Sequence, residues 1–247
     1  MAVTLEVLGC GDAFGSGGRF HSCYLLASGD ELTLIDCGAS APAALQQRGI
    51  AQPEIDAVVL THLHGDHYGG VPVLLLDAAY NRERTSALIV AGPPGLEARI
   101  TATLDLLFPG SPARVRERVP VRFVELTAGA AVSIGTLMVT PFAVRHPSGA
   151  PSYALRIAVD DKVVAFSGDA AWDSVLLEVS READLFVCEC TAFREPVPFH
   201  ISLTELQAQA SELSARRILL THLGREMLRH VEEAPWPCAA DGMVVAL

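Results

Sequence analysis

The sequence predicts an α/β sandwich, with β-sheet in the middle and helices on the outside. Two observations favour this fold class. Short apolar or alternating segments, typical of strands, recur along the whole chain. Segments with helical periodicity are distributed between them rather than collected at one end, and they are fewer than the strand candidates.

The strand candidates are short runs rich in valine, isoleucine and leucine, and most are bounded by glycine, proline or acidic residues. They are residues 3–8, 22–27, 32–36, 57–61, 87–91, 121–126, 137–142, 153–159, 162–167, 185–189, 218–221 and 243–247. Such short strands fit a sheet-rich middle layer.

The helix candidates lie between these strands, at residues 41–48, 70–82, 96–107, 172–180 and 202–214. The last of them begins with Ser202 and has Glu205 three residues later. This spacing is a capping box, in which each side chain binds the backbone N–H of the other residue, so it predicts a helix start at Ser202.

Length and composition predict one domain spanning residues 1–247. A chain of 247 residues, 50% of them hydrophobic and 19% charged, can bury a substantial core. No internal repeat, low-complexity tract or linker divides it. The net charge of −11 disfavours nucleic acid as a partner, because binding to a phosphate backbone is driven by basic surfaces.

The chain is expected to be cytoplasmic and to have no membrane partner. Its first residues lack a basic signal region, and its apolar runs, such as residues 71–76, are far shorter than the ~20 residues of a membrane span. The six cysteines include no Cys-x-x-Cys pair, so reduced thiols are expected.

A predicted strand at residues 57–61 runs directly into four candidate metal ligands, in the order His62, His64, Asp66 and His67. Alternation along the strand end places His62 and His64 on one side, where two imidazoles can bind one ion. Gly65 permits a sharp turn, so that Asp66 and His67 can face a second ion. Three clustered histidines are unsuited to an ordinary core, because each imidazole needs a hydrogen-bond partner or a metal.

The run Thr-His-Leu-His-Gly-Asp-His, followed by Gly-Val-Pro at residues 70–72, resembles the signature of the metallo-β-lactamase superfamily, and specifically its ribonuclease Z branch. The resemblance spans nearly the whole chain, because His146, Asp169 and His222 follow in the order of that family's later ligands. It implies an αββα sandwich with two central mixed β-sheets flanked by helices.

The resemblance also implies two divalent metal ions. The first would be held by His62, His64 and His146, the second by Asp66, His67 and His222, and Asp169 would bridge the two. Imidazole and carboxylate ligands without thiolate suit zinc, with manganese or iron as substitutes. The implied nucleophile is a metal-bridged hydroxide, since two ions lower the pKa of a shared water to roughly 7.

Two further residues are predicted to be catalytic together with Asp66. The segments Cys-Glu-Cys-Thr-Ala-Phe at 188–193 and Phe-His-Ile-Ser at 199–202 resemble the Glu and His segments of ribonuclease Z, with cysteines in place of two flanking residues. The resemblance implies His200 as the general acid that protonates the leaving group, and Glu189 as its partner.

Candidate substrate contacts come from two places. The glycine-rich stretch at residues 9–22 resembles the family's opening loop and offers His21 and Ser22, near which a phosphate could lie. Tyr153 is a candidate contact to a base or an aromatic leaving group, although it also fits an ordinary core tyrosine.

One feature of ribonuclease Z is missing, namely the long tRNA-binding arm. In that family the arm is inserted between the residues that correspond to His146 and Asp169. Only residues 147–168 fill that interval, and a short loop and two strands use them all. We therefore expect a phosphodiesterase acting on a small phosphodiester. Three alternatives stay open: a tRNA 3′-end endonuclease, a thioester or lactone hydrolase, and a non-enzymatic metal-bound binding module. A homodimer is also left open.

Overall fold

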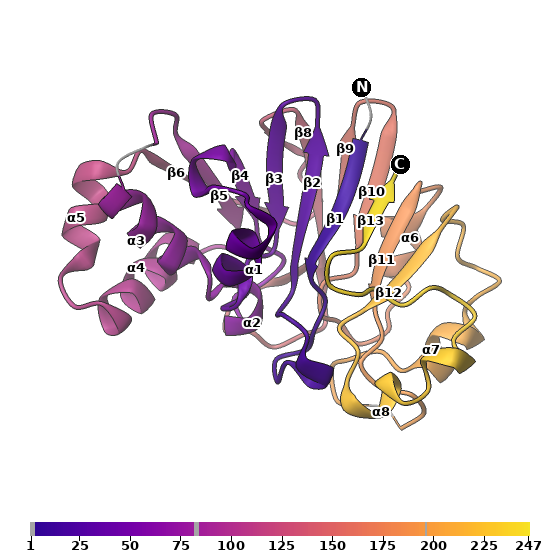
Figure 1. Ribbon diagram of the computed structural model, residues 1–247. Coiled ribbons are helices and arrows are strands. Elements are labelled where there is room, and N and C mark those ends of the chain that lie inside the picture. Colours follow the sequence, from indigo (N-terminus) through magenta and orange to yellow (C-terminus); the bar gives the residue numbers. More distant parts are fainter. Residues whose placement is uncertain (1–2, 82–83, 196) are drawn as a thin grey trace.

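Two mixed β-sheets lie face to face in the computed structural model, which describes residues 3–81, 84–195 and 197–247 (Figure 1). The first sheet has the order β13-β1-β2-β3-β4-β5-β6, and the second has the order β12-β11-β10-β9-β8-β7. The strands of the first sheet are β1 Val3–Gly9, β2 Cys23–Ser28, β3 Glu31–Ile35, β4 Ala57–Val59, β5 Leu88–Gly92, β6 Val121–Glu125 and β13 Val244–Ala246. Those of the second are β7 Val132–Ile134, β8 Leu137–Val144, β9 Ser152–Val159, β10 Lys162–Phe166, β11 Leu185–Glu189 and β12 Ile218–Thr221.

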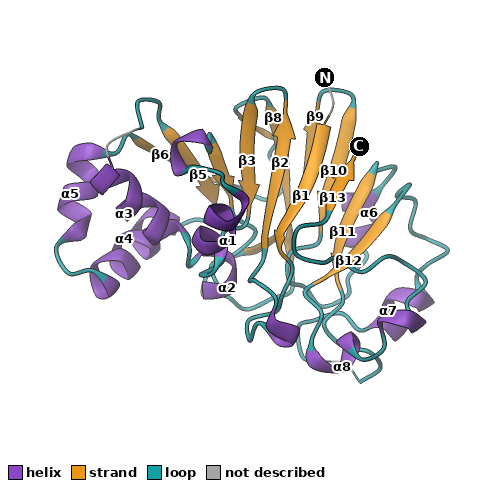
Figure 2. Cartoon of the chain, viewed as in Figure 1, coloured by secondary structure: helices purple, strands orange, loops and turns teal. Residues whose placement is uncertain are grey.

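Helices connect the parallel strands and cover the outer faces of both sheets. The neighbours β3, β4, β5 and β6 are parallel, and parallel strands cannot be joined by hairpins, so the chain crosses between them through helices. The helices are α1 Ala41–Arg48, α2 Gly65–Tyr68, α3 Val71–Asn81, α4 Leu96–Leu107, α5 Ser111–Arg118, α6 Val175–Ser180, α7 Leu203–Ala208 and α8 Arg225–Leu228. Figure 2 shows α3, α4 and α5 beside β5 and β6, with α7 and α8 on the other side of the molecule.

The core has three apolar layers, which match this order of helix, sheet, sheet and helix. The central layer joins residues of both sheets, such as Val7 and Val59 with Leu155 and Val187. A second layer packs the first sheet against α1, α3 and α4, and a third packs the second sheet against α6, α7 and α8. The predicted αββα sandwich is therefore confirmed.

Strand direction brings several loops to one edge of the sandwich. In the first sheet β3 and β4 are parallel, so the residues that follow them share an edge. In the second sheet β10, β11 and β12 are parallel, and β8 runs the same way because both β8 and β10 are antiparallel to β9. The carboxyl ends of strands at such an edge are where α/β proteins build their sites.

The structure corrects several predicted elements. Strand β7 and helices α2, α5 and α8 were not predicted, because β7, α2 and α8 have only three or four residues and α5 buries only Val115 along its length. Helix α7 ends at Ala208 rather than at residue 214, where the chain continues in polar turns. Helix α6 begins at Val175 rather than at residue 172, because the carboxylate of Asp173 accepts the backbone N–H of Val175. The expected end of the second helix, residue 82, lies outside the described residues.

No helix in the described parts of the chain is both long enough and apolar enough to cross a membrane.

Candidate metal centre

The four clustered candidate ligands follow β4, two of them in the connecting segment and two within α2. All three residues of β4 are buried, and the chain leaves the strand through Leu60 and Thr61 to reach His62, which has no exposed surface. His64 precedes the short helix α2, whose first turn contains Asp66 and His67. His62 and His64 therefore follow the end of a strand, whereas Asp66 and His67 lie at the start of a helix.

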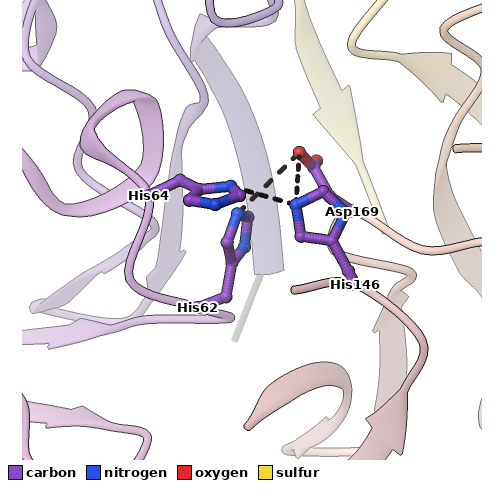
Figure 3. A group of neighbouring side chains, drawn as sticks. All are labelled: His62, His64, His146 and Asp169. Carbon is purple, nitrogen blue, oxygen red and sulfur yellow. Dashed lines mark hydrogen bonds and ion pairs between the residues drawn. The ribbon is translucent and has the colours of Figure 1, made fainter. Parts of the chain in front are cut away.

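The structure gathers a first group of ligands from His62, His64, His146 and Asp169 (Figure 3). Their donor atoms all lie within 4.8 Å of one another. The carboxylate Oδ2 of Asp169 is 3.8 Å from Nε2 of His62 and 3.8 Å from Nε2 of His146. Nε2 of His146 is in turn 3.0 Å from Nδ1 of His64. His64 thus presents Nδ1 to the group, whereas the other two histidines present Nε2.

A second group consists of Asp66, His67, Asp169 and His222. Nε2 of His67 is 3.3 Å from Asp66 and 3.3 Å from Oδ1 of Asp169. Nε2 of His222 is 3.3 Å from Asp66 and 3.4 Å from Oδ2 of Asp169. Asp169 belongs to both groups and directs one oxygen to His67 and the other to His222. This is the position that a bridging ligand requires.

Each of the four histidines that present Nε2 has a partner for its other ring nitrogen. Nδ1 of His67 is 2.7 Å from the Asp36 carboxylate, and Nδ1 of His62 is 3.0 Å from the Thr61 hydroxyl. The remaining two are paired in the same way: His146 with the carbonyl of Phe199 at 3.1 Å, and His222 with the hydroxyl of Thr191 at 3.0 Å. Such outer partners fix the tautomer and the ring orientation of metal-binding histidines.

Asp36 is a site residue that the sequence argument missed. It follows β3, and its carboxylate accepts the backbone N–H and the hydroxyl of Thr61 as well as binding His67. The signal that could have identified it is an aspartate at the end of a strand candidate, residues 32–36, at the same sheet edge. Two residues later Gly38 lies so close to the Asp66 carbonyl that any Cβ would collide with it, so glycine is required there.

The charges of the cluster favour bound cations. Burial lowers the pKa of His62 well below its ordinary value, so this imidazole is neutral, as a ligand must be. Burial opposes charge on His222, but the nearby Asp169 carboxylate raises the pKa of His222 to about 9. Burial also opposes charge on Asp169, yet His222 and His67 hold its pKa well below the usual range. The buried carboxylates of Asp66 and Asp169 thus attract positive charge. Divalent ions would supply this charge in place of the protons on the histidines.

The residues present fit two metal ions on structural grounds. Nε2 of His62 and Nε2 of His67 are buried and have no hydrogen-bond partner among the described residues, which is costly unless a metal occupies them. Two ligands each about 2.1 Å from a tetrahedral ion would be about 3.4 Å apart. The observed separations of 3.3 to 3.8 Å around Asp169 agree with that value.

Glu189 and His200 meet beside the second group. Nδ1 of His200 is 3.0 Å from Oε1 of Glu189, which ends β11 and is almost fully buried. The Glu189 carboxylate also accepts the backbone N–H of Ala170 at 2.7 Å and the hydroxyl of Thr191 at 2.8 Å. Burial opposes charge on His200, but the hydrogen bond to Glu189 raises the pKa of His200 above its ordinary value. The contact with Glu189 therefore favours the protonated form of this imidazole.

The three candidate substrate contacts have different positions. Tyr153 is buried, and its hydroxyl donates to the carbonyl of Leu126, so it is a core tyrosine and the predicted contact is wrong. Ser22 is also buried, and together with Asp36, His67 and His222 it lines a small cavity of about 20 Å³, so its contact with substrate stays a prediction. His21 is half-buried, with its backbone N–H bound to the Ser40 hydroxyl.

Sequence comparison finds relatives along almost the whole chain. Residues 3–235 match the family model described as Anti-Pycsar protein Apyc1. The Anti-Pycsar protein Apyc1 of Paenibacillus sp. (strain J14) is 31% identical over 237 residues, which cover 92% of this chain and 91% of that protein.

Solved structures with the same fold include two of low sequence identity. The metallo-β-lactamase fold protein YhfI from Bacillus subtilis superimposes with a TM-score of 0.82 at 22% identity, and the match covers 100% of this chain and 99% of that one. The short form of human tRNase Z superimposes with a TM-score of 0.77 at 22% identity, covering 98% of each chain.

Proposed function

We propose that this chain, a metallo-hydrolase that belongs to the Anti-Pycsar protein Apyc1 family of the metallo-β-lactamase superfamily, is a phosphodiesterase. Its substrates would be compact, and cyclic nucleotides would be the substrate class. The observation that carries the proposal is the hydrogen-bonded pair of Glu189 and His200 beside the metal cluster. Cleavage of a phosphodiester releases an alkoxide, which is a poor leaving group unless it is protonated.

The cofactor in this proposal is a pair of zinc ions, with manganese or iron as substitutes, because the donors are imidazoles and carboxylates without a thiolate. His62, His64 and His146 would hold one ion, Asp66, His67 and His222 the other, and Asp169 both. When bound, the two ions supply positive charge for the phosphoryl oxygens and a water of lowered pKa. The protein holds the ligand atoms in place beforehand through the outer partners of the histidines.

His200 is placed to protonate the leaving group. Its Nδ1 is engaged by Glu189, which leaves Nε2 as the nitrogen that can donate a proton to the substrate. The ring lies against two metal-binding histidines, with ring centroids 5.0 Å from His146 and 5.5 Å from His222. A substrate oxygen held at the metal cluster would therefore be within a short distance of the acid.

The short chain between His146 and Asp169 supports a compact substrate. This interval contains β9 and β10 joined by a turn at Asp160 and Asp161, with no inserted arm. The net charge of −11 also disfavours a long polyanion. Family membership suggests a cyclic nucleotide, in which one phosphodiester is part of a small ring and the leaving group is an alkoxide. No part of this substrate needs a long binding surface.

The first test compares substrate classes. Purified protein with zinc or manganese should hydrolyse bis-nitrophenyl phosphate and cyclic nucleotides, and chelation should abolish both activities. Rapid hydrolysis of nitrophenyl esters without phosphodiester turnover would replace the proposal with a carboxyl-compound hydrolase. Efficient, site-specific cleavage of a tRNA precursor would replace it with a tRNA endonuclease.

The role of His200 is tested by leaving-group dependence. His200→Ala should slow a cyclic nucleotide, which has a poor leaving group, by ~10²-fold or more, because this is the usual contribution of acid catalysis. Turnover of bis-nitrophenyl phosphate should fall much less, since nitrophenolate leaves without a proton. His230→Ala is the matched control, because His230 binds Glu233 and stacks on Phe193 but belongs to neither ligand group, so its loss should change neither rate. Equal losses for both substrates in His200→Ala would remove the assignment.

A further inference from the structure

The hydroxyl group of Thr191 connects the Glu189–His200 pair to the candidate metal ligand His222. This oxygen is 2.8 Å from Oε2 of Glu189, 3.0 Å from Nδ1 of His222 and 3.3 Å from Nδ1 of His200. It is also 3.0 Å from the carbonyl of His222. Among the described residues, the other outer partners of the histidine ligands, Thr61, Asp36 and Phe199, have no such bond to Glu189.

The direction of these hydrogen bonds follows from counting protons. A hydroxyl has one proton to donate and two lone pairs that accept. Glu189 can only accept when ionised, and its contact is the shortest, so the Thr191 proton is assigned to Glu189. The hydroxyl oxygen then accepts the Nδ1–H of His222. In the neutral imidazole that metal binding requires, the other ring nitrogen, Nε2, is then unprotonated, and it is directed at Asp66 and Asp169.

We propose that Thr191 is a positioning residue that sets the tautomer of His222 for the second metal ion and, through the same hydroxyl, orients Glu189 for the acid His200. The second part rests on the proposed function, whereas the first concerns metal binding alone. One side chain thus fixes the acid relative to the second ion. The benefit is geometric, because acid catalysis requires the proton donor within hydrogen-bond reach of the departing oxygen.

The backbone around Thr191 is held by main-chain hydrogen bonds and does not depend on the Thr191 hydroxyl. The carbonyl of Thr191 accepts the N–H of Gly224, and the N–H of Cys190 donates to the carbonyl of Thr221. His222 itself has a φ of +56°, and its N–H donates to the carbonyl of Cys10. These main-chain bonds hold the 190–191 and 221–224 segments together without the side chain. Replacing the hydroxyl by a methyl group should therefore leave the backbone in place.

The experiment uses Thr191→Val, which keeps the shape and removes the hydroxyl, and Thr191→Ser, which keeps the hydroxyl. Thr204→Val is the matched control, because Thr204 is exposed on α7 and its hydroxyl donates to the carbonyl of Phe193 rather than to Glu189 or a histidine. Zinc affinity of each of the two sites is measured by competition with a chelator. Thr191→Val should bind one of the two ions about 10- to 100-fold more weakly, while Thr191→Ser and Thr204→Val bind both as the parent protein does.

Two further readouts separate positioning from general damage. In zinc-loaded parent protein, NMR should detect a protected Nδ1–H proton on His222, and this protection should be lost in Thr191→Val and kept in Thr191→Ser. The ratio of cyclic nucleotide to bis-nitrophenyl phosphate turnover should fall in Thr191→Val only.

Unchanged zinc affinity together with a protected His222 proton in Thr191→Val would overturn the proposal, as would a Thr191→Ser protein that behaves like Thr191→Val. If Thr191→Val does not fold, Thr191→Ala is measured with the same expectations. Zinc affinity and the NMR signal do not depend on the substrate, so they decide the role of Thr191 even if the parent protein hydrolyses no phosphodiester.

Discussion

Asp169 is the residue on which both ligand groups depend. Its two oxygens face different histidines, and the carboxylate is almost fully buried. Two cations a few ångströms apart repel each other strongly, and a shared carboxylate reduces this repulsion. The preceding Gly168 has a φ of +56°, and a Cβ there would lie 2.6 Å from the carbonyl of Tyr153, so the turn that presents Asp169 requires glycine.

Replacing this bridge should therefore affect both ions. We predict that Asp169→Ala, dialysed against a fixed free zinc concentration, retains less than one ion per chain, whereas the parent protein retains two. Elemental analysis measures the content. Asp161→Ala is the control, because that side chain is 81% exposed on the far turn between β9 and β10. Two retained ions in Asp169→Ala would show that this carboxylate does not bridge.

Asp36 should matter for metal binding without touching the metal. Its carboxylate accepts from His67 and from Thr61, so an amide at this position would set an N–H against one of these donors. We predict that Asp36→Asn lowers zinc affinity about 10- to 100-fold. Asparagine tolerates the φ of +56° at this position, so the backbone should not be disturbed.

Asp160→Asn is the control for this prediction, since Asp160 has a similar φ of +51° but lies in the turn at the opposite end of β10 from Asp169. Zinc titration of both variants gives the comparison. Equal affinities in Asp36→Asn and in the parent protein would mean that the hydrogen bond to His67 does not support the ligand.

Sequence alone could identify the candidate metal ligands that the structure brings together, but not the outer partners of the histidines. His62, His64, Asp66 and His67 are close in sequence, so local geometry determines their arrangement. Asp36 and Thr191 act on histidines 31 residues away, and only the pairing of strands brings them together. Tyr153 was wrongly predicted to contact substrate, because the sequence pattern of a strand tyrosine is the same whether it faces a site or the core.

At the level of elements, the second sheet brings Glu189 and His200 together through β11 and the loop between β11 and α7. Glu189 ends the strand, and His200 lies two residues before the first residue of the capping box. The hydroxyl of Ser202 accepts the N–H of Glu205, and the Glu205 carboxylate accepts the N–H of Ser202 at 2.9 Å. This cap was predictable from the Ser-x-x-Glu spacing, whereas the early end of α7 was not, because it depends on where packing contacts stop.

The cap should contribute to the stability of the protein. We predict that Ser202→Ala lowers the free energy of unfolding by about 1 kcal/mol, which is the usual cost of losing a side-chain cap. Ser174→Ala is the matched control, because Ser174 is the N-cap residue of α6 but its side chain makes no capping hydrogen bond. Denaturant unfolding of both variants tests this. Equal effects would show that the capping bond adds nothing.

Elements without a strong pattern were the ones that sequence reasoning missed. Helix α5 is rich in arginine and buries only Val115, so no apolar stripe revealed it, although Pro112 in its first turn is a helix-start signal. Strand β7 has three residues and is the edge strand next to β8. Both lie at the periphery of the fold, where packing constrains the sequence least.

At the scale of the whole molecule, charge and shape support the same substrate. The acidic surface should repel polyanions, and no inserted arm lies between β8 and β10 in the described chain. We predict that long RNA inhibits cyclic nucleotide hydrolysis only weakly at physiological salt. The inhibition constant, measured at several salt concentrations, provides the check. Tight inhibition that weakens steeply with salt would instead indicate an extended phosphate-binding surface.

The most direct test of the central claim is cyclic nucleotide hydrolysis in water enriched in ¹⁸O, with the product analysed by mass spectrometry. The account predicts a nucleoside monophosphate with one ¹⁸O atom on its phosphate. The product should appear with zinc or manganese and be lost on chelation. It should also be lost in His64→Ala, because the His64 side chain lies next to His146 in the first ligand group. A protein shown by elemental analysis to contain two metal ions, yet forming no labelled monophosphate from any cyclic nucleotide, would contradict it.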